Sequence, residues 1–373
     1  MPKMTLEKKK TVILRLYQCG NSIKTDNGLA KSIISERLDF VPHKKLYKFR
    51  TCQEINFKTL EEECIWMSPA SSFPDLFDCT INIDILKNRK EIENWLHNEY
   101  PILCYDLSKL FLEQRGVVIP YTHADFTEYV QTCLDCDGNP IPMQEKAFLQ
   151  KHASPSELSQ MDHILKLVNV LRSRFAQIED RAYEGIVETI NLIRTQTRDS
   201  MLVYCMTERK DNPVFWENYA DNYTGFCVEY DFSKFERCSF EDFKNLVYLL
   251  PITYRKTKPY FDVVPFLDGA MREVISKDST WQRDPYLNAE LNMQLYYKRK
   301  DYEYEHEWRF SIKNESNNKQ KFPFVHGIFA GKDIHSADLL RLKTIAKKLS
   351  VPLYQQMINK SRNNFEYIMV NES

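Results

Sequence analysis

Short stretches in which apolar and polar side chains alternate predict β-strands, and they occur toward both ends of the chain. The predicted strands cover residues 45–50, 64–68, 201–207, 225–231, 252–255, 302–312, 325–330 and 365–370. Helices are predicted at 27–38, near 57–63 and at 336–349. Residues from about 85 to 199 are largely helical in pattern, with apolar side chains at helical spacing. This order is typical of an α+β fold, because the regular alternation of a βαβ fold is missing.

The pattern also predicts how the chain divides. We expect an N-terminal extension over residues 1–44, followed by a single α+β domain over residues 45–373. The helical block at about 85–199 is then a large insertion between the early and the middle strands of that domain.

The predicted strand at 302–312 reads Y-E-Y-E-H-E-W-R-F-S-I and concentrates charge on one face. Alternation places four charged side chains together, namely Glu303, Glu305, Glu307 and Arg309. Three neighbouring carboxylates repel one another, which raises the pKa of at least one of them unless cations neutralise them. The alternative is an ordinary solvated sheet face, balanced by nearby lysines and Arg309.

Composition limits the class of protein. The chain has 373 residues and a net charge of -1, so it lacks the strongly basic balance of many nucleic-acid-binding proteins. No segment approaches the roughly 20 apolar residues of a membrane span. Ten cysteines without a secretion signal predict reduced thiols in the cytoplasm. We therefore expect a cytoplasmic protein with no membrane partner.

Glycine is scarce, with nine in the whole chain. There is no G-x-G-x-x-G, and G-I-F-A-G-K at 327–332 is one residue short of a P-loop. Any bound nucleotide is therefore held without a glycine-rich loop. The motifs G-x-S-x-G and H-E-x-x-H are also absent. Cys133 and Cys136 form a lone C-x-x-C with His123 as a possible third ligand, and we expect no metal there because zinc needs four ligands.

Five segments in order resemble a mostly bacterial family without a known activity, the domain of unknown function 2971 family. They are L-Y-K-F-R at 46–50, I-W-M-S-P-A-S-S-F-P-D-L-F-D-C at 65–79, Y-C-M-T-E at 204–208, W-E-N-Y-A-D-N-Y-T-G-F-C-V-E-Y-D at 216–231 and K-R-K-D-Y-E-Y-E-H-E-W-R at 298–309. The chain departs from the family's N-D-P-F-D loop at 74–78, from its histidine near Tyr223 and from its tryptophan near Tyr302. A role that needs the loop asparagine is therefore in doubt.

A second, more distant resemblance is to ADP-ribosyltransferases, which join a small split β-sheet to helical insertions and use NAD as substrate without a glycine motif or a metal. That family has an arginine or histidine on a first strand, a serine on a second and E-x-E on a late strand. Arg50, Ser68 and Glu305-His306-Glu307 occur here in that order. The resemblance implies that Glu307 stabilises the ribose cation and that Glu305 positions or deprotonates the acceptor.

The same resemblance suggests how the rest of an NAD site is built. Arg50 binds a phosphate, Ser68 supports the ribose or the glutamate, and the remaining NAD-binding candidates are Tyr47, Trp216, Tyr219, Lys298 and Arg309. Five of these residues have a structural alternative, in which Lys298 only neutralises Glu305 or Glu307 and the other four have the following roles. Arg50 pairs with an acid on a neighbouring strand, Ser68 ends a strand, and Trp216 and Tyr219 are core residues.

Three functions remain open at this point. The first is an NAD-using ADP-ribosyltransferase or glycohydrolase, a toxin or anti-phage effector that modifies an unidentified protein or nucleic acid, with a possible regulatory or defence-system partner. The second is a metal-dependent nuclease whose site comprises Asp75, Asp78, Glu305, Glu307 and Lys298. The third is a non-catalytic sensor or partner-binding module that uses the helical block. If the loop residues Asp75 and Asp78 bind neither metal nor substrate, they serve as caps.

Overall fold

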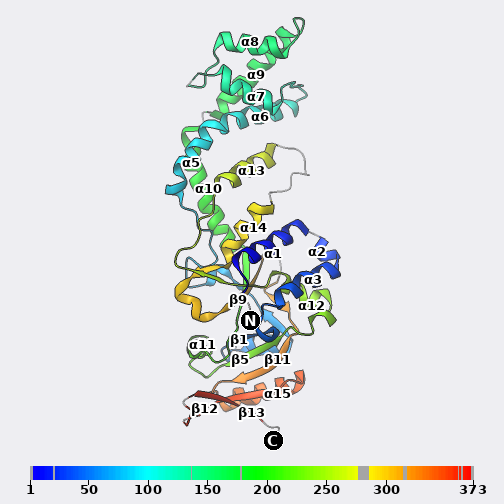
Figure 1. The fold of residues 1–373 in the computed structure, drawn as a ribbon, viewed down its shortest axis with the longest axis vertical. Helices are drawn as coiled ribbons and strands as arrows, with labels where there is room; N and C mark the ends of the chain where they lie inside the picture. Colours follow the sequence, from blue (N-terminus) through cyan, green and yellow to red (C-terminus); the bar gives the residue numbers. More distant parts are fainter. Residues whose placement is uncertain are drawn as a thin grey trace. The chain divides into compact units, whose positions relative to one another are not determined.

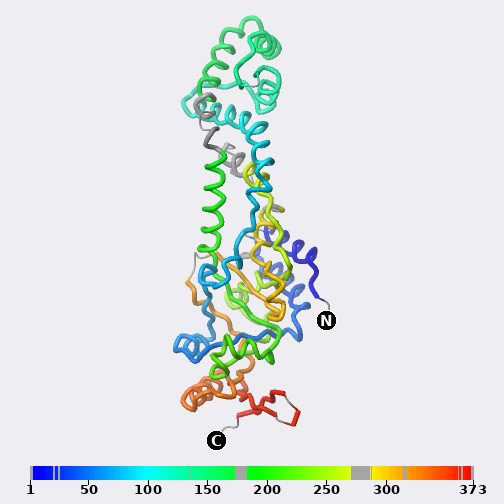
Figure 2. Tube along the Cα trace, turned by 90° about the vertical axis from the view of Figure 1, so that its left-hand side faces the viewer, coloured from blue at the N-terminus to red at the C-terminus, as the bar shows by residue number. Residues whose placement is uncertain are grey.

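The computed structural model of the chain describes residues 3–19, 22–135, 137–176, 179–275, 285–313, 317–359, 361–362 and 364–370. It divides into two compact units (Figures 1 and 2). Unit 1 comprises Met1–Asn82, Arg194–Pro259 and Asn288–Ser373, and unit 2 comprises Ile83–Ile193 and Tyr260–Leu287. None of the described helices combines the length and apolar composition that a membrane crossing would need.

Unit 1 is built on a mixed sheet of nine described strands in the order β13-β12-β11-β5-β1-β4-β9-β6, with β3 added beside β4. The strands are β1 (Lys45–Arg50), β3 (Ser68–Pro69), β4 (Met201–Thr207), β5 (Phe226–Asp231), β6 (Leu250–Pro251), β9 (Glu307–Lys313), β11 (Val325–Ala330), β12 (Leu353–Asn359) and β13 (Asn364–Met369). The pair β11–β12 is parallel and the other pairs are antiparallel. In Figure 2, β12 and β13 form the hairpin drawn in red.

Two small strand pairs and several helices complete unit 1. The pairs are β2 (Cys64–Trp66) with β10 (Lys319–Lys321), and β7 (Thr253–Arg255) with β8 (Tyr297–Arg299). The helices are α1 (Leu6–Cys19), α2 (Ser22–Thr25), α3 (Asn27–Leu38), α4 (Glu54–Glu61), α11 (Pro213–Asn218), α12 (Phe240–Phe243) and α15 (Ser336–Leu349). The 3₁₀ helices are η1 (Pro42–Lys44), η2 (Ala70–Ser72), η3 (Phe235–Arg237), η4 (Lys244–Tyr248), η5 (Gln294–Tyr296) and η6 (Lys300–Glu305).

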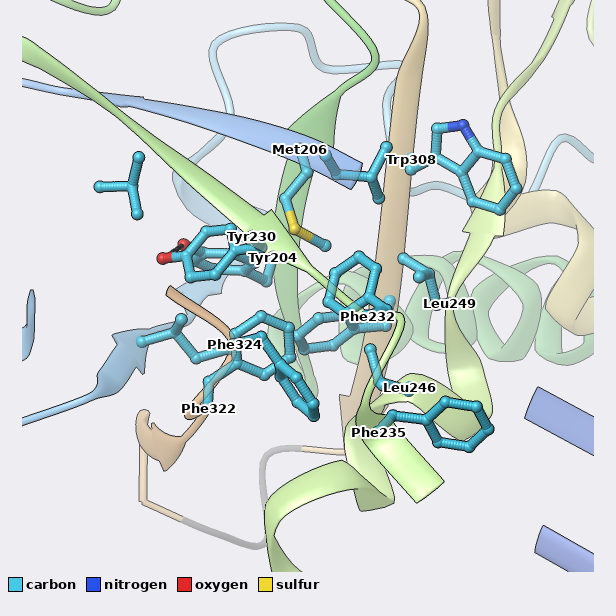
Figure 3. Close-up of a cluster of buried hydrophobic side chains, with 14 of the residues drawn as sticks. Tyr204, Met206, Tyr230, Phe232, Phe235, Leu246, Leu249, Trp308, Phe322 and Phe324 are labelled. Atoms are coloured by element: carbon cyan, nitrogen blue, oxygen red, sulfur yellow. Dashed lines mark hydrogen bonds between the residues drawn. The ribbon is translucent and has the colours of Figure 1, made fainter. Parts of the chain in front are cut away.

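The main core of unit 1 lies on one face of this sheet. Alternate side chains of the central strands point into it, among them Tyr204, Trp308 and Phe310, each no more than 1% exposed. Tyr204 stacks on Phe310 with ring centroids 5.6 Å apart, and Figure 3 shows Phe322 and Phe324 gathered close to Tyr204. Burial of these large rings, together with the aliphatic side chains of the same core, stabilises unit 1.

The sheet is loosely joined at its centre. Strands β1 and β4 pair at one described position, where Tyr47 lies opposite Thr207. By contrast, β4 and β9 pair at seven positions, from Met201 opposite Lys313 to Thr207 opposite Glu307. Beyond Tyr47, β1 and β4 no longer pair with each other, although β1 stays paired with β5 and β4 with β9.

Gly225 holds the other edge of β1 close to the turn before β5. A Cβ atom added at Gly225 would lie 2.2 Å from the backbone oxygen of Arg50, a distance that no side chain can occupy. The Gly225 amide donates to the Ala220 carbonyl, and the Gly225 carbonyl accepts from Gly331. A residue without a side chain is thus required for the packing of β1, β5 and β11 at this point.

Unit 2 is helical. Its helices are α5 (Ile85–Asn98), α6 (Tyr100–Glu113), α7 (His123–Cys133), α8 (Pro142–His152), α9 (Leu158–Ala176) and α13 (Val264–Ile275), while α10 (Glu179–Asp199) and α14 (Pro285–Met293) cross its boundaries. Its core contains a chain of partly buried hydrogen bonds. Tyr105 donates to Asn169 at 2.6 Å, Asn169 donates to Tyr129 at 3.0 Å, and Tyr129 donates to Glu145 at 2.7 Å.

The structure confirms a mixed α/β architecture, and it confirms the helical character predicted for residues 85–199. The predicted strand at 302–312 is wrong in its first half. Residues 300–305 form the 3₁₀ helix η6, His306 has a left-handed backbone with φ 43°, and β9 begins at Glu307. Glu303 is consequently exposed instead of joining the other two glutamates. The ADP-ribosyltransferase-like core and the predicted domain boundaries stay predictions.

Candidate functional site

A cavity of about 330 Å³ lies in unit 1 where β1 and β4 separate. Both strands line it, together with the loop that follows η2, the helix α11, and the segment from β8 to the start of β9. Its aromatic lining residues are Tyr47, Phe49, Phe73, Phe215, Tyr219 and Tyr302, and its charged ones are Lys48, Asp75, Asp78, Lys298, Glu305 and Glu307. Its volume is at the lower end of the roughly 300–1,000 Å³ that small-molecule pockets span.

Lys298 joins three carboxylates at the wall of this cavity. Its Nζ lies 2.6 Å from Glu305 Oε2, 3.1 Å from Glu307 Oε2 and 3.7 Å from Asp78 Oδ2. Both glutamates are nearly buried, with 3% and 5% of their surface exposed. Carboxylates buried at this depth need charged partners, and Lys298 supplies one for all three.

Arg309 provides the second positive charge from behind the cavity wall. It is fully buried, its Nε donates to Glu307 Oε1 at 2.6 Å, and its two terminal nitrogens donate to the Asp78 carboxylate at 2.8 and 3.2 Å. It also donates to the Leu295 carbonyl at 3.2 Å. The fork geometry of a guanidinium allows this simultaneous binding, which a lysine could not reproduce.

The two glutamates differ in acidity. Burial alone would raise the pKa of Glu307, but the charges of Arg309 and Lys298 outweigh burial and hold that pKa well below its usual range. Burial likewise opposes ionisation of Asp78, and Arg309 again lowers the pKa of this carboxyl. Glu307 and Asp78 are therefore ionised at neutral pH.

Glu305 behaves in the opposite way. Burial, with a further contribution from the charge of Glu307, raises its pKa to about 7 against the lowering effect of Lys298. One carboxylate is thus permanently ionised, and its neighbour exchanges a proton near neutral pH. Two acidic groups whose pKa values are driven apart are a recurring basis of acid–base and electrostatic catalysis.

Hydrogen bonds explain why the chain places Glu305 and Glu307 side by side despite the change from helix to strand between them. Thr207 donates from its hydroxyl to the Glu305 carbonyl at 2.6 Å, and the Glu307 amide donates to the Tyr254 hydroxyl at 2.8 Å. Tyr254 lies opposite Lys298 in the β7–β8 pair, so the same residue positions Lys298. The left-handed turn at His306 then directs both carboxylates toward one cavity.

The loop over the cavity is fixed by Arg198. Its guanidinium donates to the carbonyls of Ala70, Phe73 and Asp75 at 3.2, 2.7 and 3.1 Å. The Asp75 carboxylate accepts from the Phe77 amide at 2.9 Å, so it also serves as a turn cap, as the structural alternative expects.

Most of the predicted site residues come together here. The cavity lining includes Tyr47, Ser68, Asp75, Asp78, Tyr219, Lys298, Glu305 and Glu307, and Arg309 supports it from behind. The Tyr219 hydroxyl lies 3.4 Å from Glu305 Oε1.

Arg50 and Trp216 lie elsewhere and are not among the described residues that line the cavity. Arg50 donates to the Tyr204 hydroxyl at 3.1 Å, and its guanidinium lies over the Tyr204 ring. Trp216 is fully buried, packs edge-on against Phe49 and donates to the Lys210 carbonyl, which agrees with its interpretation as a core residue.

Sequence reasoning missed Lys48, Thr207, Cys205 and Tyr254. The one signal for Lys48 was its position, since alternation places it on the same face of β1 as the buried Leu46. A lysine within a central strand on a core-facing side is uncommon and indicates a special environment.

The described residues hold no group of three or more histidine, cysteine or acidic side chains arranged to bind a metal ion. Lys298 lies where a cation shared by Asp78, Glu305 and Glu307 would have to bind. Cys133 is a buried residue of α7, and Cys136 lies outside the described residues.

Residues 215–310 match the family described as Protein of unknown function (DUF2971). This segment includes α11, the β7–β8 pair, η6 and the beginning of β9, and so it carries Tyr219, Lys298, Glu305, Glu307 and Arg309. Comparison with curated proteins and with solved structures gives no match.

Proposed function

We propose that this protein is an NAD-using enzyme that breaks the bond between nicotinamide and ribose and transfers ADP-ribose to a macromolecule or to water. The observation that carries the proposal is the pair Glu305 and Glu307. Both carboxylates line one aromatic cavity, and Lys298 and Arg309 hold one ionised while the pKa of the other is about 7.

The lining of the cavity suits the cationic end of NAD. Four of its six charged lining residues are acidic, and aromatic rings of Phe49, Phe215 and Tyr219 lie on its walls. A pyridinium ring is both flat and positively charged, so it gains from stacking on aromatic rings and from nearby carboxylates. The volume of about 330 Å³ suits the nicotinamide end of the dinucleotide rather than the whole molecule.

The two carboxylates then have separate tasks. When the glycosidic bond breaks, its electron pair moves to the pyridinium nitrogen, which leaves neutral nicotinamide and a positive charge at the ribose C1′. Glu307 stabilises that charge as a permanently ionised group. Glu305 accepts the proton that the incoming nucleophile loses as it bonds to C1′. The proposal assigns no step to Arg50, because Arg50 lies against Tyr204.

The direct test is incubation of the purified protein with NAD labelled in the nicotinamide or the adenine. We expect Glu307→Gln to lower nicotinamide release by roughly 100-fold, because it removes the charge that stabilises the transition state. Glu303→Gln is the matched control, since Glu303 is an exposed glutamate of η6, four positions before Glu307, and should leave the rate within about twofold. Equal rates for the two variants would refute the assignment of Glu307.

Other results of these assays would favour the metal-dependent nuclease or the binding module instead. Nucleic-acid cleavage that chelation abolishes, without nicotinamide release, would favour the metal-dependent nuclease. A folded protein with neither activity, and with partner binding unchanged when both glutamates are neutralised, would favour a binding module. A toxin or anti-phage role is part of the same proposal, and it predicts that Glu307→Gln abolishes toxicity in cells.

A further inference from the structure

Lys48 lies at the point where the centre of the sheet opens. It follows Tyr47, the last position at which β1 pairs with β4, and it lines the cavity between these strands. Its Nζ lies over the ring of Tyr204, a residue of the main core, and Lys48 is also among the residues that line the cavity.

Lys48 differs from the other cations of the site in its contacts with carboxylates. Lys298 contacts three carboxylates and Arg309 contacts two, whereas no ion pair or side-chain hydrogen bond involves Lys48 in the described part of the chain. Its Nζ lies 5.0 Å from the centre of the Tyr204 ring. The Arg50 guanidinium lies 5.3 Å from the same ring, so two cations share one aromatic partner.

We infer that Lys48 is a nucleophilic amine that forms an imine with a small aldehyde or ketone bound in this cavity. A lysine is a nucleophile only when it is unprotonated, and an amine becomes so when it is removed from water next to another cation. The second cation is Arg50, which shares the Tyr204 ring with Lys48, and the cavity that Lys48 lines leaves room for a ligand.

The surrounding charges agree with this assignment. Burial and, after it, the charge of Arg50 on the same strand lower the pKa of Lys48 to about 8, against the raising effect of Cys205 on β4, Glu307 on β9 and Glu305 on η6. At pH 7 about a tenth of such an amine is neutral, compared with less than a thousandth of an ordinary lysine.

The reaction requires no oxidant and no further co-reactant. The lone pair of Lys48 Nζ bonds to the carbonyl carbon, and the carbonyl π electrons move to oxygen. The oxygen takes up one proton and the nitrogen loses one, which gives a neutral carbinolamine. The hydroxyl group then takes up a second proton and leaves as water while the nitrogen lone pair forms the C=N bond, and the nitrogen loses its second proton to give the imine. Glu305 lines the same cavity and is the acid that exchanges these protons, because its pKa is about 7.

The lining also indicates which carbonyl compounds fit. Asp75, Asp78, Glu305 and Glu307 give the cavity an acidic wall, and Lys298 is already occupied by carboxylates. A small ligand whose own carboxylate or phosphate lies inside the cavity would be repelled, so the ligand class is an uncharged or cationic carbonyl compound.

The experiment labels the whole protein at pH 7 with propionaldehyde and sodium cyanoborohydride, which reduces an imine to a stable secondary amine. Peptide mass spectrometry then gives the rate at each lysine. We expect Lys48 to react at least tenfold faster than two internal controls. These are Lys45, which lies on the same strand but is paired with Glu229 at 2.8 Å, and the exposed Lys90. A rate at Lys48 equal to that at Lys90 would overturn the inference.

Two comparisons sharpen the test. Glyoxylate, an anionic aldehyde, should give a smaller ratio of Lys48 to Lys90 labelling than propionaldehyde does, and a larger ratio would overturn the ligand class. Arg50→Met should slow labelling of Lys48 without changing Lys90, because it removes the neighbouring cation. An unchanged Lys48 rate in a folded Arg50→Met protein would refute activation by Arg50. None of these outcomes depends on whether NAD is a substrate.

Discussion

Arg309 supplies a buried positive charge to the carboxylates of Glu307 and Asp78. It has no exposed surface and binds both Glu307 and Asp78. Arg309→Met would leave two buried anions with Lys298 as their shared cation, so we expect it to lower the free energy of unfolding by roughly 3–5 kcal/mol in urea titrations. The matched control is Arg299→Met, because Arg299 is half exposed and lies 3.8 Å from Asp75.

The control should lower the free energy of unfolding far less, because an exposed ion pair contributes little to stability. If Arg309→Met and Arg299→Met have equal effects on unfolding, the buried ion network does not contribute to stability in the way the distances indicate.

Glu305 gives a separate prediction at the residue scale, in the pH dependence of stability. Its pKa is about 7 in the folded protein against 4.5 for an ordinary glutamate, so the folded state binds its proton more tightly. The resulting stabilisation is complete below pH 4.5 and is lost as the pH rises through 7, by up to about 3 kcal/mol. The low pKa values of Glu307 and Asp78 act below pH 4.5 and therefore outside this window.

Urea unfolding of wild type, Glu305→Gln and Glu303→Gln at pH 5 and pH 8 tests this. Between these two pH values the unfolding free energy of Glu305→Gln should fall by about 2 kcal/mol less than that of the wild type. Glu303→Gln should follow the wild type, because Glu303 is exposed. Identical falls in all three proteins would mean that Glu305 titrates as an ordinary glutamate.

At the scale of single elements, local alternation identifies strands and helices whose environment is simple. The strands Lys45–Arg50 and Val325–Ala330 and the helices Asn27–Leu38 and Ser336–Leu349 have the bounds predicted from the sequence. Strand β12 was missed, because Gln355 and Gln356 interrupt the apolar pattern that would mark it.

The errors near the site have tertiary causes. Residues 302–306 alternate like a strand, yet hydrogen bonds from Thr207 to the Glu305 carbonyl and from the Glu208 amide to the His306 carbonyl fix a turn there. Lys48 was overlooked because its role depends on the separation of β1 from β4, which no local pattern encodes. Glu305, Glu307, Lys298 and Asp78 were identifiable because clustered charges between aromatic residues are conspicuous in sequence.

At the scale of single elements, the testable prediction concerns the packing of Gly225 against β1. A methyl group there would overlap the Arg50 carbonyl, so Gly225→Ala must displace β1 and should lower the free energy of unfolding by roughly 1–3 kcal/mol. Gly185→Ala is the control, since a Cβ at Gly185 in α10 meets nothing within 4 Å, and it should stabilise its helix by about 0.5–1 kcal/mol. Urea unfolding measures both. A neutral Gly225→Ala would show that β1 is free to shift.

The whole molecule has separate cores in its two units. The core that contains Leu342, Trp308 and Phe310 belongs entirely to unit 1, and the core that contains Leu165 and Phe126 belongs entirely to unit 2. The cavity and its charges are built only from unit 1 residues. Loss of packing in unit 2 should therefore leave the chemistry of the cavity intact.

This arrangement predicts two unfolding transitions in calorimetry. Leu165→Ala and Leu342→Ala each remove a buried leucine, at 1% and 0% exposure, and each should cost its own unit about 2–5 kcal/mol. Because the cores share no residues, Leu165→Ala should lower one transition temperature and Leu342→Ala the other. Labelling of Lys48 measures the cavity in the same samples, and it should persist above the transition that Leu165→Ala lowers. A single transition that both variants lower equally would mean that the two units unfold as one cooperative body, with α10 and α14, which cross the boundaries, as the elements that couple them.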